Sequence, residues 1–145
     1  MIEPAFSDRV AKRTADPASA IFALKMASET LDVANEMYSR NDYNESFERS
    51  RDAIRLVSSA LMFRDGYVSD TLEGSIAYLL ERYPGMFPVE AWERIESFQS
   101  DHGTGILAFI LRILGKVNKA GAQEAKDALR AASSFVDSAR AEMVL

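Results

Sequence analysis

The feature that most constrains this chain is a long stretch without helix-breaking residues. After Pro17, no glycine or proline occurs until Gly66. Apolar residues recur within this stretch at spacings of three and four, the period of an α-helix that buries one side. The pattern predicts two long helices joined by the polar link at residues 40–42. So short a link makes consecutive helices antiparallel neighbours.

The first helix is expected over about residues 18–39. Asp16 followed by Pro17 is typical of a helix start, because aspartate caps free N–H groups and proline fits the first turn. The stripe expected to face the core is Ala20, Leu24, Ala27, Leu31, Ala34 and Tyr38. Other faces carry Phe22, Met26, Val33 and Met37. This helix therefore has apolar surface for more than one neighbour.

The second helix is expected over about residues 43–64, with Gly66 as the left-handed residue that ends it. Its core stripe is Phe47, Ser50, Ile54, Val57, Ser58 and Leu61. Small residues on this helix permit a close approach to several neighbours. We therefore expect it in the middle of the bundle.

Weaker signals divide the rest of the chain into four further elements. Ser69 or Asp70 is expected to cap the third helix, in which Leu72, Ile76, Leu79 and Leu80 face the core. Proline disfavours helical geometry in the residue before it, so Tyr83-Pro84-Gly85 ends this helix. The predicted ranges are 69–82, 88 to about 101–103, a short apolar helix at 105–114, and about 120–143.

Together these elements predict an all-α, up-and-down bundle of four to five helices plus a short apolar helix. The bundle is expected to occupy residues 18–145, with residues 1–17 as a flexible or loosely docked arm. No β-sheet is expected, because alternating runs of β-branched residues are missing. The residues expected to be buried are Leu24, Leu31, Ile54, Val57, Leu61, Ile76, Leu79, Trp92, Phe135 and Val136.

Composition argues against several functional classes. The 145 residues include 22 acidic and 17 basic side chains, for a net charge of −5, so a broad nucleic-acid-binding face is not expected. There is no cysteine and only one histidine, His102, so we expect no metal site, no cofactor and a cytoplasmic location. The longest apolar run, Ile106–Leu114, is too short to span a membrane.

Familiar catalytic motifs are missing as well. A nucleophilic hydrolase pairs Ser or Cys with His, and phosphate-binding folds use a glycine-rich turn between strand and helix. Neither pattern is visible. His102 precedes Gly103 near an expected helix end, where a solvated or capping role fits better than catalysis. We therefore predict no catalytic residues.

Two segments carry a resemblance to a known family: YNESFERSRDAIRLVSSALMFRDG at residues 43–66 and ALRAASSFVD at 128–137. With the order of helices over residues 16–143, they resemble the HEPN family, the nucleotide-binding domains of higher eukaryotes and prokaryotes. The resemblance implies a four- or five-helix bundle, commonly a homodimer. Such domains are often encoded beside a minimal nucleotidyltransferase as a toxin–antitoxin pair.

Many HEPN domains are ribonucleases that use an arginine followed about four to six residues later by a histidine. Here His102 lies eight positions after Arg94. In the most similar branch a histidine commonly follows the glycine after the second helix by six residues, and Leu72 occupies that position. Both departures argue against ribonuclease activity. A toxin that cleaves RNA through Arg94 and His102 is the least favoured alternative.

The leading hypothesis is a non-catalytic HEPN-like dimer that binds a nucleotide, or a nucleotidyltransferase partner that carries one. Guanidinium groups bind phosphate and aromatic rings stack on bases. The candidate ligand-binding residues are Arg51, Arg55, Arg64 and Tyr67. In the structural alternative, Arg51 and Arg55 instead pair with Glu48 and Asp52 on a solvated helix face.

A second hypothesis is a protein-interaction or dimerisation module with no small ligand. Large exposed apolar patches usually mark interfaces, and a self-complementary patch closes a twofold dimer. The candidate interface residues are Phe22, Met26, Ile106, Phe109, Ile110 and Ile113. A homodimer is therefore expected.

Overall fold

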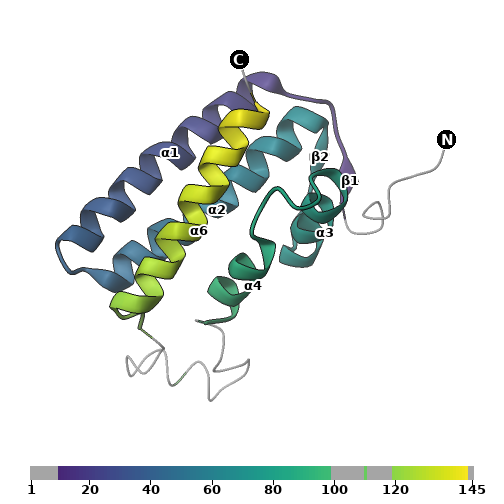
Figure 1. Cartoon of the computed structure of the whole chain (residues 1–145). Coiled ribbons are helices and arrows are strands. Elements are labelled where there is room, and N and C mark those ends of the chain that lie inside the picture. The colour runs from purple at the N-terminus through teal and green to yellow at the C-terminus, as the bar shows by residue number, and fades with distance from the viewer. Residues whose placement is uncertain (1–9, 99–109, 111–118, 144–145) are drawn as a thin grey trace.

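The computed structural model describes residues 10–98, 110 and 119–143 of the chain (Figure 1). Within these residues the protein has five helices and a two-stranded ribbon. The elements are β1 (Ala11–Lys12), α1 (Pro17–Ser39), α2 (Tyr43–Asp65), β2 (Tyr67–Val68), α3 (Leu72–Arg82), α4 (Val89–Phe98) and α6 (Ala122–Glu142). The predicted all-α class is confirmed.

The predicted start of α1 is confirmed. The Asp16 carboxylate accepts hydrogen bonds from the Ser19 backbone N–H at 3.0 Å and from the Ser19 hydroxyl at 2.6 Å. The hydroxyl bond, followed by the backbone bond, lowers the pKa of Asp16. Pro17 occupies the first turn, where its missing N–H costs nothing.

The predicted end of α2 is also confirmed. Gly66 has φ +83° and ψ +44°, the left-handed conformation, and its N–H donates to the Met62 carbonyl at 2.8 Å. A Cβ at this position would lie 2.8 Å from the backbone oxygen of Arg13. Glycine is thus required both by its backbone angle and by the close approach of the segment before α1.

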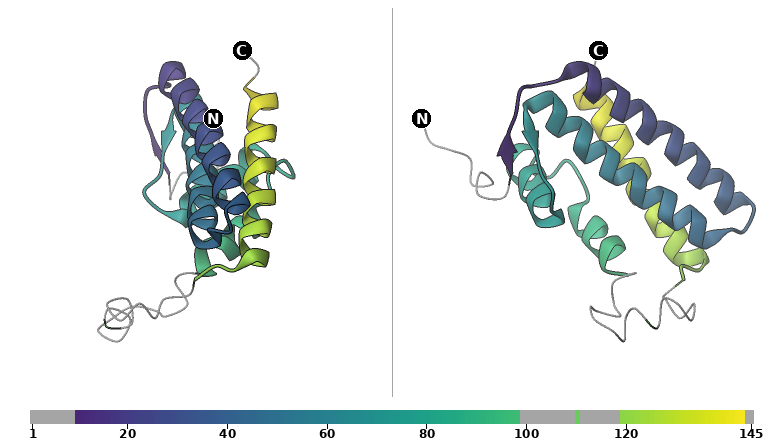
Figure 2. Two further views of the ribbon diagram at one scale, coloured as in Figure 1. Left: turned by 90° about the vertical axis from the view of Figure 1, so that its left-hand side faces the viewer. Right: turned by 180° about the vertical axis from the view of Figure 1, so that it is seen from behind.

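The helices surround α2, as its small residues predicted. Helices α1 and α2 run side by side, α6 packs against both, and α4 contacts α2 and α6 (Figures 1 and 2). One continuous cluster of buried residues fills the space between them. Phe47, Ile54 and Leu61 of α2 are at most 2% exposed within it. Consequently, α2 forms the centre of the bundle.

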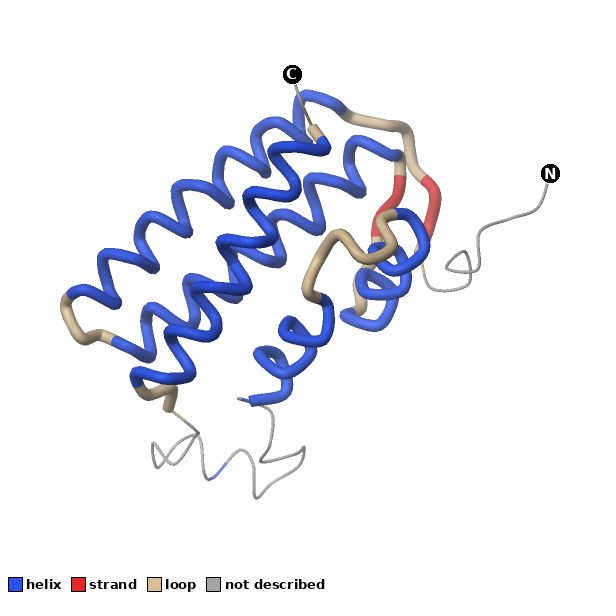
Figure 3. The backbone as a smooth tube through the Cα atoms, viewed as in Figure 1, coloured by secondary structure: helices blue, strands red, loops and turns tan. Residues whose placement is uncertain are grey.

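A two-stranded ribbon was not expected. Ala11 pairs with Val68 and Lys12 with Tyr67 in an antiparallel ladder (Figure 3). Val10 is buried in the core beside this ribbon. Of the flexible or loosely docked arm expected over residues 1–17, the described part is held by this ribbon, by buried Val10 and by bonds from Arg13 N–H to the Gly66 carbonyl and from Asp16 N–H to the Phe63 carbonyl, while residues 11–15 are exposed. Residues 1–9 lie outside the described residues.

Three local predictions also need correction. Leu31 is half-buried and Leu80 is 52% exposed, although both were expected in the core. The cap of α3 is Thr71, whose side chain accepts from Gly74 N–H at 3.0 Å, instead of Ser69 or Asp70. Of the predicted helix at 105–114 only Ile110 is described, and the end of the fourth helix lies outside the described residues.

Candidate functional site

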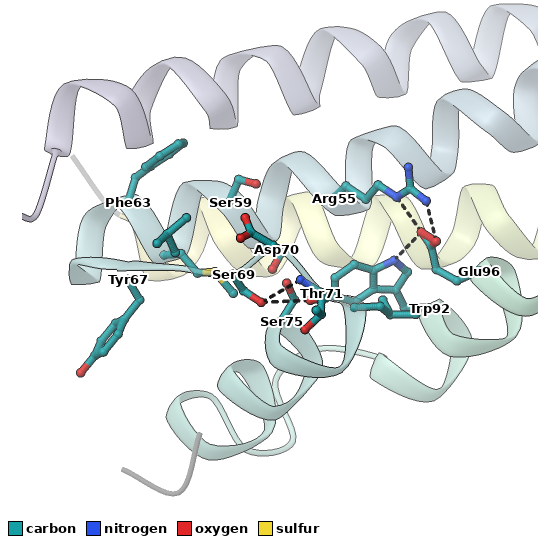
Figure 4. A pocket seen from close by; sticks show the side chains of 14 residues that line it. Arg55, Ser59, Phe63, Tyr67, Ser69, Asp70, Thr71, Ser75, Trp92 and Glu96 are labelled. Atoms are coloured by element: carbon teal, nitrogen blue, oxygen red, sulfur yellow. Dashed lines mark hydrogen bonds and ion pairs between the residues drawn. The ribbon is translucent and has the colours of Figure 1, made fainter. Parts of the chain in front are cut away.

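A cavity of about 310 Å³, lined by both polar and apolar side chains, opens between the C-terminal half of α2, the turn from β2 to α3, and α4 (Figure 4). Five serine and threonine residues line it: Ser58, Ser59, Ser69, Thr71 and Ser75. Its wall also includes Arg55, Tyr67, Asp70, Trp92 and Glu96. We name this cavity the hydroxyl groove. Its size lies at the lower end of the range for small-molecule sites.

One end of the hydroxyl groove is closed by an ion pair. Arg55 Nε donates to Glu96 Oε1 at 2.7 Å, and Arg55 Nη2 donates to Glu96 Oε2 at 2.6 Å. Trp92 Nε1 adds a bond of 3.3 Å to Glu96 Oε1. The hydrogen bond that Arg55 donates to Glu96 is the main cause of the raised pKa of Arg55. Glu96 thus neutralises the charge of the guanidinium and accepts from two of its donor atoms, Nε and Nη2.

The opposite wall is the first turn of α3. Ser69 Oγ accepts from Thr71 N–H at 3.3 Å and donates to the Thr71 carbonyl at 3.0 Å. The Thr71 hydroxyl in turn caps Gly74 N–H. The first N–H groups of a helix have no partner within it and carry partial positive charge. This wall can therefore receive hydrogen-bond acceptors, although the Asp70 carboxylate stands beside it (Figure 4).

The side chain of Ser58 in the groove is buried without a hydrogen bond. Ser58 is 3% exposed, and none of the described residues provides a hydrogen-bond partner for its Oγ. A buried hydroxyl without a partner is costly, so each case calls for an explanation. Because Ser58 lines the groove, a bound ligand is one way to satisfy it.

The structure separates the four predicted ligand residues. Arg55 and Tyr67 line the hydroxyl groove, whereas Arg51 and Arg64 do not. Tyr67 points away from Arg55 and Trp92 in Figure 4, and its ring lies 5.7 Å from that of Tyr78. Only two of the four predicted residues therefore line this cavity.

Arg64 belongs to a structural cluster at the other side of the α2 terminus. It bonds the Tyr83 hydroxyl and donates from Nη1 to the Glu142 carbonyl at 3.0 Å. The Asp65 carboxylate accepts from the hydroxyls of Tyr78 and Tyr83. Burial, followed by the bond to Asp65, raises the pKa of Tyr83 to about 12. These bonds hold α3 and the end of α6 against α2.

Sequence reasoning missed most of the groove. Trp92 was interpreted as a core anchor, which its 2% exposure supports, but its indole N–H also bonds Glu96. The spacing of four between Trp92 and Glu96 on α4 was an available signal for a shared face. Nothing in the sequence links Glu96 to Arg55, which is 41 positions earlier.

The predicted interface residues are only partly described. Phe22 is 64% exposed, Met26 36% and Ile110 44%, while Ile106, Phe109 and Ile113 lie outside the described residues.

A second cavity, of about 550 Å³, lies between α4 and α6. Its walls are mainly apolar, and it includes Phe47, Ile95 and Phe98.

The described residues contain no group of three or more His, Cys, Asp or Glu side chains arranged to hold a metal ion. None of their helices is long and apolar enough to cross a membrane. His102 lies outside the described residues, so its distance from Arg94 stays open.

Comparisons with known proteins give no relatives. No protein-family model matches the chain, and neither a curated protein nor a solved structure matches it.

Proposed function

We propose that this chain is a non-catalytic, HEPN-like bundle of the cytoplasm that binds a nucleotide, or a nucleotidyltransferase-type partner carrying one. The hydroxyl groove is the binding site. In this proposal the chain is one half of a toxin–antitoxin-like pair.

The unpaired hydroxyl of Ser58 is the observation that carries this proposal. A folded core normally pairs its buried polar atoms, whereas Ser58 Oγ has no hydrogen-bond partner among the described residues, and Ser58 lines the hydroxyl groove. Ser59 and Ser75 supply further donors and acceptors on the same groove. A nucleoside, which has several ring nitrogens and sugar hydroxyls, complements such a surface.

The charges around the groove suggest how a nucleotide is oriented. Glu96 holds Arg55, and Asp70 adds negative charge, so the interior does not favour phosphate. The base and sugar fit against Trp92 and the serines instead. The phosphate is then expected toward solvent, at the first turn of α3, where free N–H groups favour an anion.

The test is binding of adenosine, AMP, ADP, ATP and GTP, measured by calorimetry and by thermal shift. A nucleoside or nucleotide should bind, and Ser58→Ala should weaken it about tenfold, the equivalent of one lost hydrogen bond. Ser50→Ala is the matched control, because Ser50 is also buried without a described partner but does not line the groove. No binding at millimolar concentrations would refute the nucleotide proposal.

A second candidate function is protein interaction without a small ligand. The 64% exposure of Phe22 favours it, because a solvent-facing phenylalanine on a long helix is typical of a contact surface. Under this alternative no nucleotide binds in the groove. Ribonuclease activity stays the least favoured function: we expect no RNA cleavage, and cleavage abolished by His102→Ala would contradict that expectation.

A further inference from the structure

The cavity of about 550 Å³ between α4 and α6 has a continuous apolar lining. Phe47 of α2, Ile95 of α4 and Ala131 of α6 line it, and all three are buried. The ring of Phe98 lies 5.3 Å from the ring of Phe47, measured between their centres. We name this cavity the α4–α6 groove. Its size and apolar lining are typical of sites for small organic molecules.

Two arginines also line the α4–α6 groove, one from each helix: Arg94 of α4 and Arg130 of α6. Both residues are exposed. Among the described residues, neither guanidinium has a hydrogen bond or an ion pair. A guanidinium binds a carboxylate through two parallel N–H bonds. The groove therefore combines an apolar interior with two cations that can each accept an anionic partner.

The two arginines lie on the same side of the α4–α6 groove. The stripe of α4 that lines it is Ala91, Ile95 and Phe98, and the stripe of α6 is Asp127, Ala131 and Ser134. Each arginine comes three positions after the first residue of its stripe, which places it 60° short of a full turn at about 100° per residue. Figures 1 and 2 show α4 and α6 running in opposite directions, so equivalent flanks of the two helices meet. Arg94 and Arg130 are thus placed to share one acidic group.

Two carboxylates that line the groove are bonded within their own helix. Glu124 Oε1 accepts from the Gly121 N–H at 3.3 Å, and Asp127 Oδ1 accepts from Gln123 Nε2 at 2.8 Å. Around α6, Glu124 is about 120° and Asp127 about 60° from Arg130. The arginine side of the groove therefore favours an anion. Because the charges of the four described ionisable residues that line the groove sum to zero, a singly charged group fits better than a doubly charged phosphate.

We propose that the α4–α6 groove binds an amphipathic monocarboxylate, an organic acid with an apolar chain. The carboxylate lies between Arg94 and Arg130, and the chain lies along Phe47, Ile95 and Phe98. This site is additional to the proposed nucleotide site, because none of the described residues lines both cavities. Failure of nucleotide binding in the hydroxyl groove therefore leaves it standing.

Calorimetry of the full chain with hexanoate, octanoate and decanoate tests the apolar part of the site. Octanoate should bind about tenfold tighter than hexanoate, because it buries two more methylene groups. 1-Octanol, which has the same chain without the charge, should bind at least about tenfold more weakly than octanoate. No binding of decanoate at millimolar concentrations, or equal binding of octanol and octanoate, would overturn the proposal.

Substitution of the arginines tests the acid end of the site. Arg94→Gln and Arg130→Gln should each weaken octanoate binding about tenfold, the equivalent of one lost charge-assisted hydrogen bond. Lys126→Gln is the matched control, because it makes the same change of charge at an exposed position of α6 outside the groove. Its affinity should stay within about twofold of the parent. Equal losses in all three variants would show a general effect of charge and contradict a site at the arginines.

Filling the groove tests where the ligand lies. Ser134 is exposed and lines the α4–α6 groove, so Ser134→Phe should block octanoate binding without loss of helicity. Lys126→Phe adds a ring to α6 outside the groove and should bind octanoate as the parent does. Circular dichroism of both variants confirms that they are folded. Undiminished binding to folded Ser134→Phe would place the ligand elsewhere and overturn the proposal, and the arginine variants decide the matter if Ser134→Phe does not fold.

Discussion

Arg55 on α2 and Glu96 on α4 are joined by two parallel hydrogen bonds, 2.7 and 2.6 Å long. Two contacts in one plane fix the angle between the side chains as well as their distance. Glu96 is also the acceptor for the Trp92 indole. The pair therefore sets where α4 lies along α2, and with it the width of the hydroxyl groove.

Replacing Glu96 by Gln removes the charge that balances Arg55 while keeping the size of the side chain. The free energy of unfolding should fall by only about 1 kcal/mol, because Arg55 is half exposed and solvent screens its charge. The released guanidinium should, however, create affinity for inorganic phosphate. Calorimetry with phosphate checks this, and equal phosphate binding by the parent would contradict it.

Ser58→Ala is expected to leave the ligand-free protein as stable as the parent or more stable by up to about 1 kcal/mol. The substitution removes a buried hydroxyl that has no described partner, and with it a desolvation cost. Ser50→Ala should behave alike. Urea unfolding of both variants without ligand provides the measurement. A loss of more than about 1 kcal/mol in either would show that its hydroxyl is paired in solution.

Gly66→Ala and Gly85→Ala separate backbone strain from a steric clash. Both glycines have positive φ, +83° and +72°, but a Cβ at Gly85 meets no atom within 4 Å. Each should lose about 1 to 2 kcal/mol for the left-handed conformation. Gly66→Ala should lose at least about 1 kcal/mol more, since the Arg13 backbone must move. Chemical denaturation measures both, and equal losses would contradict a tight contact with Arg13.

The protein should lose stability at alkaline pH through Tyr83. Burial, and then the bond to Asp65, raise the pKa of Tyr83 from 10.0 to about 12. The folded state therefore keeps a proton that the unfolded state releases, so this contribution is complete below about pH 10 and disappears toward pH 12. Urea unfolding between pH 9 and about 11.5 should show a shallower decline for Tyr83→Phe. An unchanged decline would argue against this assignment.

Local sequence signals predicted where the helices begin and end better than they predicted which residues neighbouring helices would cover. Asp16 and Gly66 were recognised as helix ends because each acts through bonds to neighbouring residues. Leu31 and Leu80 have the correct helical spacing, but burial also depends on which neighbouring helix reaches that turn. Among the described residues, α1 and α3 are each covered on one side only.

The candidate site was less predictable because it also depends on contacts between helices that are far apart in the sequence. Arg55 was identified from its side-chain chemistry, but its partner Glu96 belongs to another helix. Arg64 has the same chemistry and instead bonds Glu142, which is 78 positions away. Sequence identifies residues capable of binding an anion. The packing of helices decides which of them are already used by the protein itself.

The ribbon between β1 and β2 has a consequence for the order of folding. Helices α1 and α2 can meet through a three-residue link, whereas β1 must wait for β2, more than fifty positions later in the chain. Closing a long loop costs more entropy than closing a short one. The turn that carries Ser69 and Thr71 follows directly after β2. A newly made chain should therefore form the hairpin of α1 and α2 early, and complete the hydroxyl groove only after β1 has returned to the residues beside Gly66.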